Sequence, residues 1–228
     1  MVRRTLAAMV IGLSLLMGAG IAWAADYQKG LESHQVGDFA TALREWRPLA
    51  DQGNARAQRG MGLMYRWGQG VVEDHKEAVR WYRLAAEQGN VYGQFSLGKM
   101  YDFGLGVVEN DKEAARWYRL AAEQGLEYAQ SFLGNMYEFG LGVVEDHKGA
   151  AKWYRLAAEQ GNASALRDLV RIEKKLRSEA TDAYVADCQF RNIEKVVSDA
   201  AGKIVQRYCR DRANKHIEGK TLDWLLRQ

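Results

Sequence analysis

The sequence predicts an all-α protein, a right-handed α-solenoid of helix–loop–helix repeats with a small C-terminal extension. The first observation is a segment, Trp-Tyr-Arg-Leu-Ala-Ala-Glu-Gln-Gly, that recurs unchanged at Trp81–Gly89, Trp117–Gly125 and Trp153–Gly161. The copies are 36 residues apart, and residues 91–126 match residues 127–162 at 25 of 36 positions. A period of about 20–50 residues is the signature of stacked repeats. The second observation is that apolar residues recur with helical spacing within each unit.

The first 24 residues have the features of a secretory signal peptide. Arg3 and Arg4 precede an apolar run, Leu6–Gly20, and an Ala-x-Ala motif follows at residues 22–24. We therefore expect cleavage before Ala25, export, and no membrane insertion of the mature chain. An uncleaved membrane anchor is the alternative, but the apolar run is short for a span of about 20 residues.

Residues 25–54 are predicted to form an atypical N-terminal repeat, as the terminal units of solenoids commonly are. Tyr27–Gln35 is expected to be its first helix, and Asp38 is expected to cap its second. Residues 55–162 then hold three repeats of 36 residues each.

The middle repeat, residues 91–126, shows how one unit is expected to fold. Val91–Phe103 has helical periodicity, and Gly104 suits the left-handed conformation that ends a helix. A second helix is predicted to start near Asn110 and to stop at Gly125. We expect the three repeated tryptophans to fill the core between neighbouring hairpins. Close helix approach is expected at the glycines inside the first helices, Gly62, Gly98 and Gly134.

The chain after the repeats is predicted to begin with a capping helix over residues 163–180, whose polar outer face ends the stack. Residues 181–228 form an extension that contains Cys188 and Cys209, the two cysteines of the chain. Export to an oxidising compartment predicts a disulfide between them. One straight helix over 21 residues would separate them by about 30 Å, so the chain must reverse. The β-branched runs around Asp199–Gly202 predict a β-hairpin, and a helical hairpin is the alternative.

Composition and motifs argue against several classes of function. The chain has 32 Lys+Arg against 29 Asp+Glu, a net charge of +3, which is not the basic excess of a nucleic-acid-binding protein. Its histidines do not have metal-ligand spacing, and we predict neither a metal nor a cofactor. Ser96-Leu97-Gly98-Lys99 matches the S-x-x-K motif of penicillin-binding enzymes, but the K-T-G and S-D-N motifs are missing from the sequence. We therefore predict that the protein is not an enzyme.

The repeat pattern resembles the Sel1-like repeat, a relative of the tetratricopeptide repeat, from about Tyr27 to Leu169. The residues that carry the resemblance, with their copies one period away, are Leu97-Gly98, Met100-Tyr101, Gly104, Gly106 and Trp117-Tyr118. The resemblance implies a periplasmic adaptor whose concave face binds another protein in bacterial envelope assembly or signalling. An inhibitor, for instance an immunity protein that neutralises a periplasm-directed toxin, is the alternative. A penicillin-interacting hydrolase is a third, weaker one.

Candidate partner-binding positions are those that differ between nearly identical repeats, because packing does not fix them. On the first helices, which line the concave face in such solenoids, these positions recur at i, i+4 and i+7. We call them the variable stripe, which is basic in the first repeat, mixed in the second and acidic in the third. Drift on a solvated face is the alternative explanation. The stripe consists of Arg59, Leu63, Arg66, Phe95, Lys99, Asp102, Ser131, Asn135 and Glu138.

Overall fold

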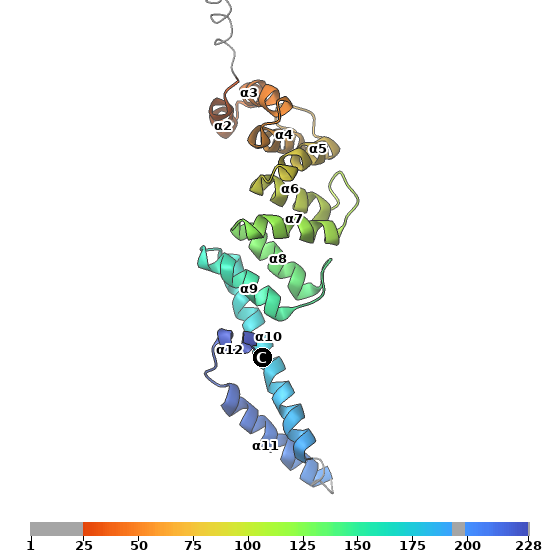
Figure 1. The fold of residues 1–228 in the computed structure, drawn as a ribbon, viewed down its shortest axis with the longest axis vertical. Coiled ribbons are helices and arrows are strands. Elements are labelled where there is room, and N and C mark those ends of the chain that lie inside the picture. Colours follow the sequence, from red (N-terminus) through yellow and green to blue (C-terminus); the bar gives the residue numbers. More distant parts are fainter. Residues whose placement is uncertain (1–24, 193–198, 228) are drawn as a thin grey trace, which may run out of the picture. The chain divides into compact units, whose positions relative to one another are not determined.

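The computed structural model describes residues 25–192 and 199–227 (Figure 1). The predicted signal peptide, residues 1–24, lies outside the described residues. Within the described ranges the regular structure is helical, without a strand, and the helices inside each compact unit pack as repeats of an α-solenoid. The chain divides into two compact units, unit 1 over Met1–Glu109 and unit 2 over Asn110–Gln228.

Unit 1 contains five described helices, each packed against the next. They are α2 (Tyr27–Gln35), α3 (Phe39–Asp51), α4 (Ala55–Trp67), α5 (His75–Glu87) and α6 (Val91–Asp102). Asp38 caps α3 as predicted, and Asp74 caps α5 in the same way. Both carboxylates accept hydrogen bonds from backbone N–H groups in the first turn. The core of the unit lies between α3, α4 and α5 and consists of Ala42, Trp46, Ala50, Ala57, Met61, Met64 and Trp81.

The tyrosine that follows each repeated tryptophan is buried more deeply than the tryptophan itself. Tyr82, Tyr118 and Tyr154 are fully buried, whereas the exposed fractions of Trp81 and Trp117 are 2% and 6% and Trp153 is only half-buried. The physical reason is a close helix approach. A methyl group on Gly62 would overlap the ring of Tyr82, and one on Gly134 would overlap the ring of Tyr154. Glycine on the first helix therefore makes room for tyrosine on the second.

The second glycine of each Gly-x-Gly loop joins one repeat to the repeat before it. In unit 1, Gly106 has a φ of +72° and lies against the backbone of His75, at the start of α5. In unit 2, Gly142 lies in the same way against the backbone of Asp111. A side chain at either glycine would collide with backbone, so these loops fix how adjacent hairpins stack.

Unit 2 contains the third repeat and the C-terminal part of the chain. Its described helices are α7 (Asp111–Glu123), α8 (Glu127–Phe139), α9 (His147–Glu159), α10 (Ala163–Asn192), α11 (Asp199–Ile217) and α12 (Leu222–Arg227). The capping helix expected over residues 163–180 thus continues to Asn192. Figure 1 shows α11 running back alongside α10, and α12 also contacts α10.

The predicted β-hairpin is wrong where the structure describes it, because residues 199–217 form α11; residues 195–198 of that prediction lie outside the described residues. The alternative, a helical hairpin, is what the described helices form. Cys209, Ala213 and Ile217 are buried at every fourth position, which is helical periodicity. Cys188 and Cys209 form the disulfide, with their Cα atoms 5.7 Å apart.

The C-terminal helices complete a core with the capping helix. Ile172 and Leu176 of α10 pack in one cluster with Ile217 of α11, and Trp224 of α12 packs against it. The apolar stripe of the capping helix is therefore covered by the extension. None of the helices in the described ranges combines the length and the apolarity needed to cross a bilayer.

Candidate binding face

The positions of the variable stripe in unit 1 lie together on α4 and α6, which contact each other. All are half-buried, with part of each side chain accessible. The Arg59 guanidinium lies over the ring of Tyr92, 5.2 Å from its centroid. The Lys99 ammonium lies 5.9 Å from the centroid of the Phe95 ring and 6.0 Å from that of Phe103. Cationic groups and aromatic rings therefore alternate on this face.

Exposed aromatic side chains border the stripe at the same position in all three repeats. Trp67, Phe103 and Phe139 end or follow the first helices, and their exposed fractions are 59%, 56% and 57%. Tyr92 and Tyr128, near the start of α6 and α8, are also exposed. These residues are not among the candidates expected from the sequence, although an aromatic residue recurs directly after the last stripe position of each repeat.

The electrostatics of the face in unit 1 are set by clustered cations around a buried phenol. Burial raises the pKa of Tyr82 to about 12, although Arg66 and Arg59 lie close enough to oppose the shift. Burial, and then repulsion by Arg66, lowers the pKa of Lys99, while Asp102 acts in the opposite direction. Tyr82 therefore stays protonated at neutral pH and keeps a proton that it can donate to an acceptor.

In unit 2 the corresponding positions form a closed polar network. Tyr154 Oη lies 2.8 Å from Glu138 Oε2, to which it donates, and 2.9 Å from Asn135 Oδ1. Arg171 pairs with the other oxygen of Glu138 and, at 2.8 Å, with Asp168. Burial raises the pKa of Tyr154, and the hydrogen bond to Glu138 raises it further.

The prediction that packing does not fix the stripe fails at two positions. The exposed fractions of Ser131 and Glu138 are 7% and 4%, so neither residue belongs to a solvated face. The Glu138 carboxylate is buried because its neighbours Tyr154 and Arg171, on later helices, satisfy its oxygens. Of the stripe in unit 2, only Asn135 keeps a partly exposed side chain.

The two tyrosines give a matched test of this difference. Tyr154→Phe should lower the free energy of unfolding by about 1–3 kcal/mol, because it leaves Oε2 of the buried Glu138 carboxylate without the phenol that donates to it. Tyr82→Phe should be neutral or slightly stabilising, since the Tyr82 hydroxyl is buried without a hydrogen-bond partner among the described residues. Urea unfolding of both variants measures the difference, and equal losses of stability would contradict it.

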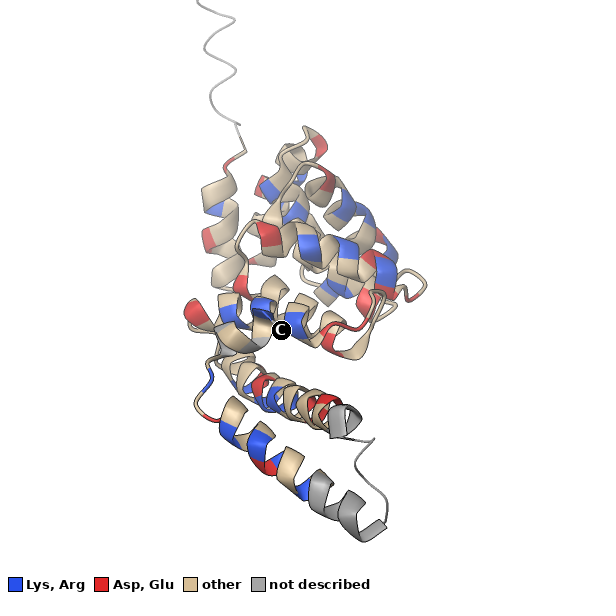
Figure 2. Cartoon of the chain, turned by 60° about the horizontal axis from the view of Figure 1, so that its bottom comes forward, with Lys and Arg blue, Asp and Glu red and all other residues tan. Residues whose placement is uncertain are grey.

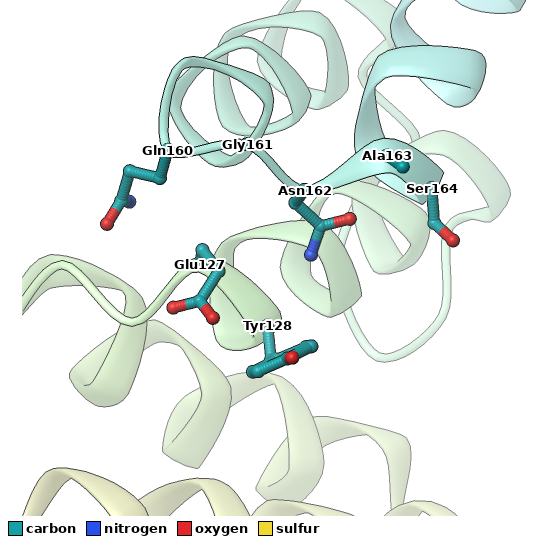
Figure 3. Close-up of a pocket in the computed structure, with 7 residues that line it drawn as sticks. All are labelled: Glu127, Tyr128, Gln160, Gly161, Asn162, Ala163 and Ser164. Atoms are coloured by element: carbon teal, nitrogen blue, oxygen red, sulfur yellow. The ribbon is translucent and has the colours of Figure 1, made fainter.

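A shallow pocket of about 270 Å³ lies in unit 2 where α8 starts and α9 connects to α10. Figure 3 shows the side chains around it, which contribute one carboxylate, one phenol and several short polar groups. The pocket therefore suits polar contacts and offers no pair of acid and base groups. Its lining residues are Glu127, Tyr128, Gln160, Gly161, Asn162, Ala163 and Ser164.

The other candidate sites of the sequence do not assemble into a reactive centre. Ser96 of the S-x-x-K match is 8% exposed on α6, and its hydroxyl lies near Tyr82. In the part of the chain that the structure describes, no group of three His, Cys, Asp or Glu residues is placed to hold a metal ion. Basic and acidic residues are interspersed over the described helices of each unit (Figure 2).

The three repeats of this chain match a known repeat family. The model of the Sel1 repeat family matches residues 55–90, 91–126 and 127–162, which are the units of the 36-residue period. The chain is 39% identical to a Sel1 repeat protein from Oxalobacter formigenes, over 57% of this chain and 98% of that one, with a TM-score of 0.54.

A second solved structure, a protective antigen present in uropathogenic Escherichia coli strains, displays an SLR fold. It is 31% identical over 84% of this chain and 47% of that one, with a TM-score of 0.60. The present chain thus spans about half the length of the Escherichia coli protein. None of the curated proteins compared with the chain matches it.

Proposed function

Because this chain belongs to the Sel1 repeat family, we propose that it is a protein-binding scaffold whose partner docks on the first helices of its repeats. The observation that carries the proposal is the recurrence of an exposed aromatic residue at one repeat position, at Trp67 and Phe103 in unit 1 and at Phe139 in unit 2. Aromatic and arginine side chains contribute much of the binding energy of protein interfaces. Exposed aromatic side chains also favour binding because a partner that covers them removes apolar surface from water.

In unit 1 the docking face combines these rings with the variable stripe. Arg66 lies 4.8 Å from the centroid of the Trp67 ring, so the cation and the ring form one amphipathic patch. Leu63 adds a partly accessible aliphatic group between the cations on α4. In unit 2, Phe139 has the Arg171 guanidinium 5.8 Å from its ring centroid. Each unit thus offers a ring and a cation to the partner.

The proposed location is the bacterial periplasm, where the protein acts as an adaptor in envelope assembly or signalling. The disulfide between Cys188 and Cys209 supports an oxidising compartment. The signal-peptide pattern of residues 1–24 supports export.

Binding rather than catalysis is the proposed role of Ser96 and its neighbours. Ser96 is buried, and the raised pKa of Tyr82 keeps the phenol protonated, so it cannot act as a general base near neutral pH. A nucleophilic serine needs a base that removes its proton. The arrangement therefore supports hydrogen-bond donation to a bound acceptor.

Site-specific photocross-linking in cells that make the protein tests the proposal. Benzoylphenylalanine in place of Phe103 should cross-link a discrete periplasmic protein, because this position lies on the proposed face. The control is benzoylphenylalanine in place of Val72, which is 87% exposed in a loop of the same unit. Cross-links from Val72 without any from Phe103 would place the interface on the loops and contradict the proposal. A toxin as the cross-linked protein would identify an inhibitor rather than an adaptor.

A further inference from the structure

The third repeat contains a carboxylate site that the chain fills with its own residue. The Tyr154 hydroxyl donates to Glu138, and Arg171, on the first helix of the next hairpin, pairs with the same carboxylate. The three groups come from α9, α8 and α10. A phenol and a cation from two further helices thus hold one carboxylate, 3% exposed, between them.

The first repeat has the same phenol and cation without the carboxylate. Two periods of 36 residues earlier, Tyr82 stands where Tyr154 does, Lys99 stands where Arg171 does, and Arg66 replaces Glu138. The site in unit 1 therefore carries a second cationic group at the position that supplies the acid in unit 2. Arg59, one helical turn from Leu63 on α4, also lies within electrostatic reach of Tyr82.

Two buried donors on this site lack an acceptor. The Tyr82 hydroxyl and the Arg59 Nε–H are both buried, and within the described ranges neither has a hydrogen-bond partner of normal geometry. Arg66 and Ser96 lie near enough to the hydroxyl to lower its pKa. The guanidinium of Arg66 has no acceptor atom, and Ser96 forms no hydrogen bond of normal geometry with the hydroxyl. Buried donors are seldom left unpaired, so both groups are available to an acceptor from outside the chain.

We propose that Tyr82, Arg66, Lys99 and Arg59 form a binding site for a carboxylate of the partner protein, in an acidic segment that also carries aromatic or aliphatic residues. The inference rests on the proposed protein-binding function. A bound carboxylate accepts the Tyr82 proton and neutralises the repulsion between Arg66 and Lys99, as Glu138 accepts the Tyr154 proton in unit 2. The exposed rings of Trp67, Tyr92 and Phe103 border the site and would cover apolar neighbours of the acidic residue.

Fluorescence anisotropy with a labelled probe peptide tests the site. The probe alternates glutamate and phenylalanine, and its control carries glutamine in place of glutamate. The purified protein should bind the glutamate peptide with a Kd lower by at least about tenfold, because the neutral amides of the control peptide cannot form ion pairs with Arg66 and Lys99. Acetate should displace the probe better than inorganic phosphate at the same ionic strength. Equal binding of both peptides, or stronger displacement by phosphate, would overturn the carboxylate assignment.

Arg66→Glu places in unit 1 the acid that unit 2 already contains. The variant should keep the melting temperature of the parent, because the introduced carboxylate can accept from Tyr82 and pair with Lys99. Since that carboxylate takes the place of the partner's, the variant should bind the peptide at least about tenfold more weakly. Lys99→Gln and Tyr82→Phe should also weaken binding, and both remain informative should Arg66→Glu fail to fold. Lys76→Gln, which removes an exposed charge from α5 of the same unit, should stay within about twofold of the parent. A folded Arg66→Glu protein that binds the peptide like the parent would overturn the proposal.

The photocross-link from position 103 separates failure of this site from failure of the proposed function. If the partner cross-links to the parent and equally to Arg66→Glu, the scaffold function stands and the carboxylate site does not. If neither protein yields a cross-link, the scaffold function itself fails. Loss of the cross-link in Arg66→Glu alone supports both.

Discussion

Trp81→Ala is expected to lower the free energy of unfolding by about 3–5 kcal/mol, the cost of removing a large buried aromatic side chain. The Trp81 ring is 2% exposed and belongs to the same core cluster as Trp46 and Met64, on the preceding helices. Its removal leaves a cavity between neighbouring hairpins. Since the stability of a typical domain is only roughly 5–15 kcal/mol, the variant should be marginally folded.

The matched control is Trp67→Ala in the same unit. The Trp67 ring is mostly exposed, and its described contact is the guanidinium of Arg66. Its removal should change the free energy of unfolding by about 0.5 kcal/mol or less. Urea unfolding of both variants, followed by circular dichroism, provides the comparison. If the two substitutions cost the same, the division between a core tryptophan and a surface tryptophan is wrong.

Gly106→Ala is expected to produce the second large effect, because the added methyl group meets two obstacles. The φ of +72° costs an L-residue about 1–2 kcal/mol. The methyl group would also overlap the backbone of His75, and backbone cannot move aside as a flexible side chain can. Overpacking of this kind adds about 1–3 kcal/mol.

Gly89→Ala is the control that has the backbone strain of a positive φ without a collision. Gly89 has a φ of +81°, but a methyl group there would meet nothing within 4 Å. This variant should therefore lose only the conformational part, about 1–2 kcal/mol. The difference between the two melting temperatures measures how tightly the Gly106 loop is packed on α5. Equal melting temperatures would show that this loop does not fix the stacking of hairpins.

The sequence by itself determined the repeat architecture, because its signals are local. A helix cap is recognised from one side chain and the backbone two or three residues on, and Asp38 and Asp74 cap the expected helices. The 36-residue period gave the family units without any knowledge of packing. The pairing of Cys188 with Cys209 followed from the presence of two cysteines in a chain expected to be exported.

Only the tertiary structure decided which residues of the variable stripe are accessible. Glu138 has the sequence context of a surface residue, one helical turn from Asn135, yet its carboxylate is buried by Tyr154 and Arg171. Those residues lie 16 and 33 positions further along the chain, so no local pattern shows the burial.

The same physical reason explains the C-terminal extension. Its β-branched residues favoured a hairpin locally, but Cys209, Ala213 and Ile217 gain more by burial along α10 in a helix. Burial depends on residues distant in sequence, whereas propensity and capping depend on neighbours. The helices of the repeats could therefore be predicted from the sequence, whereas α11 and the donors left without an acceptor at Tyr82 and Arg59 became evident only in the folded chain.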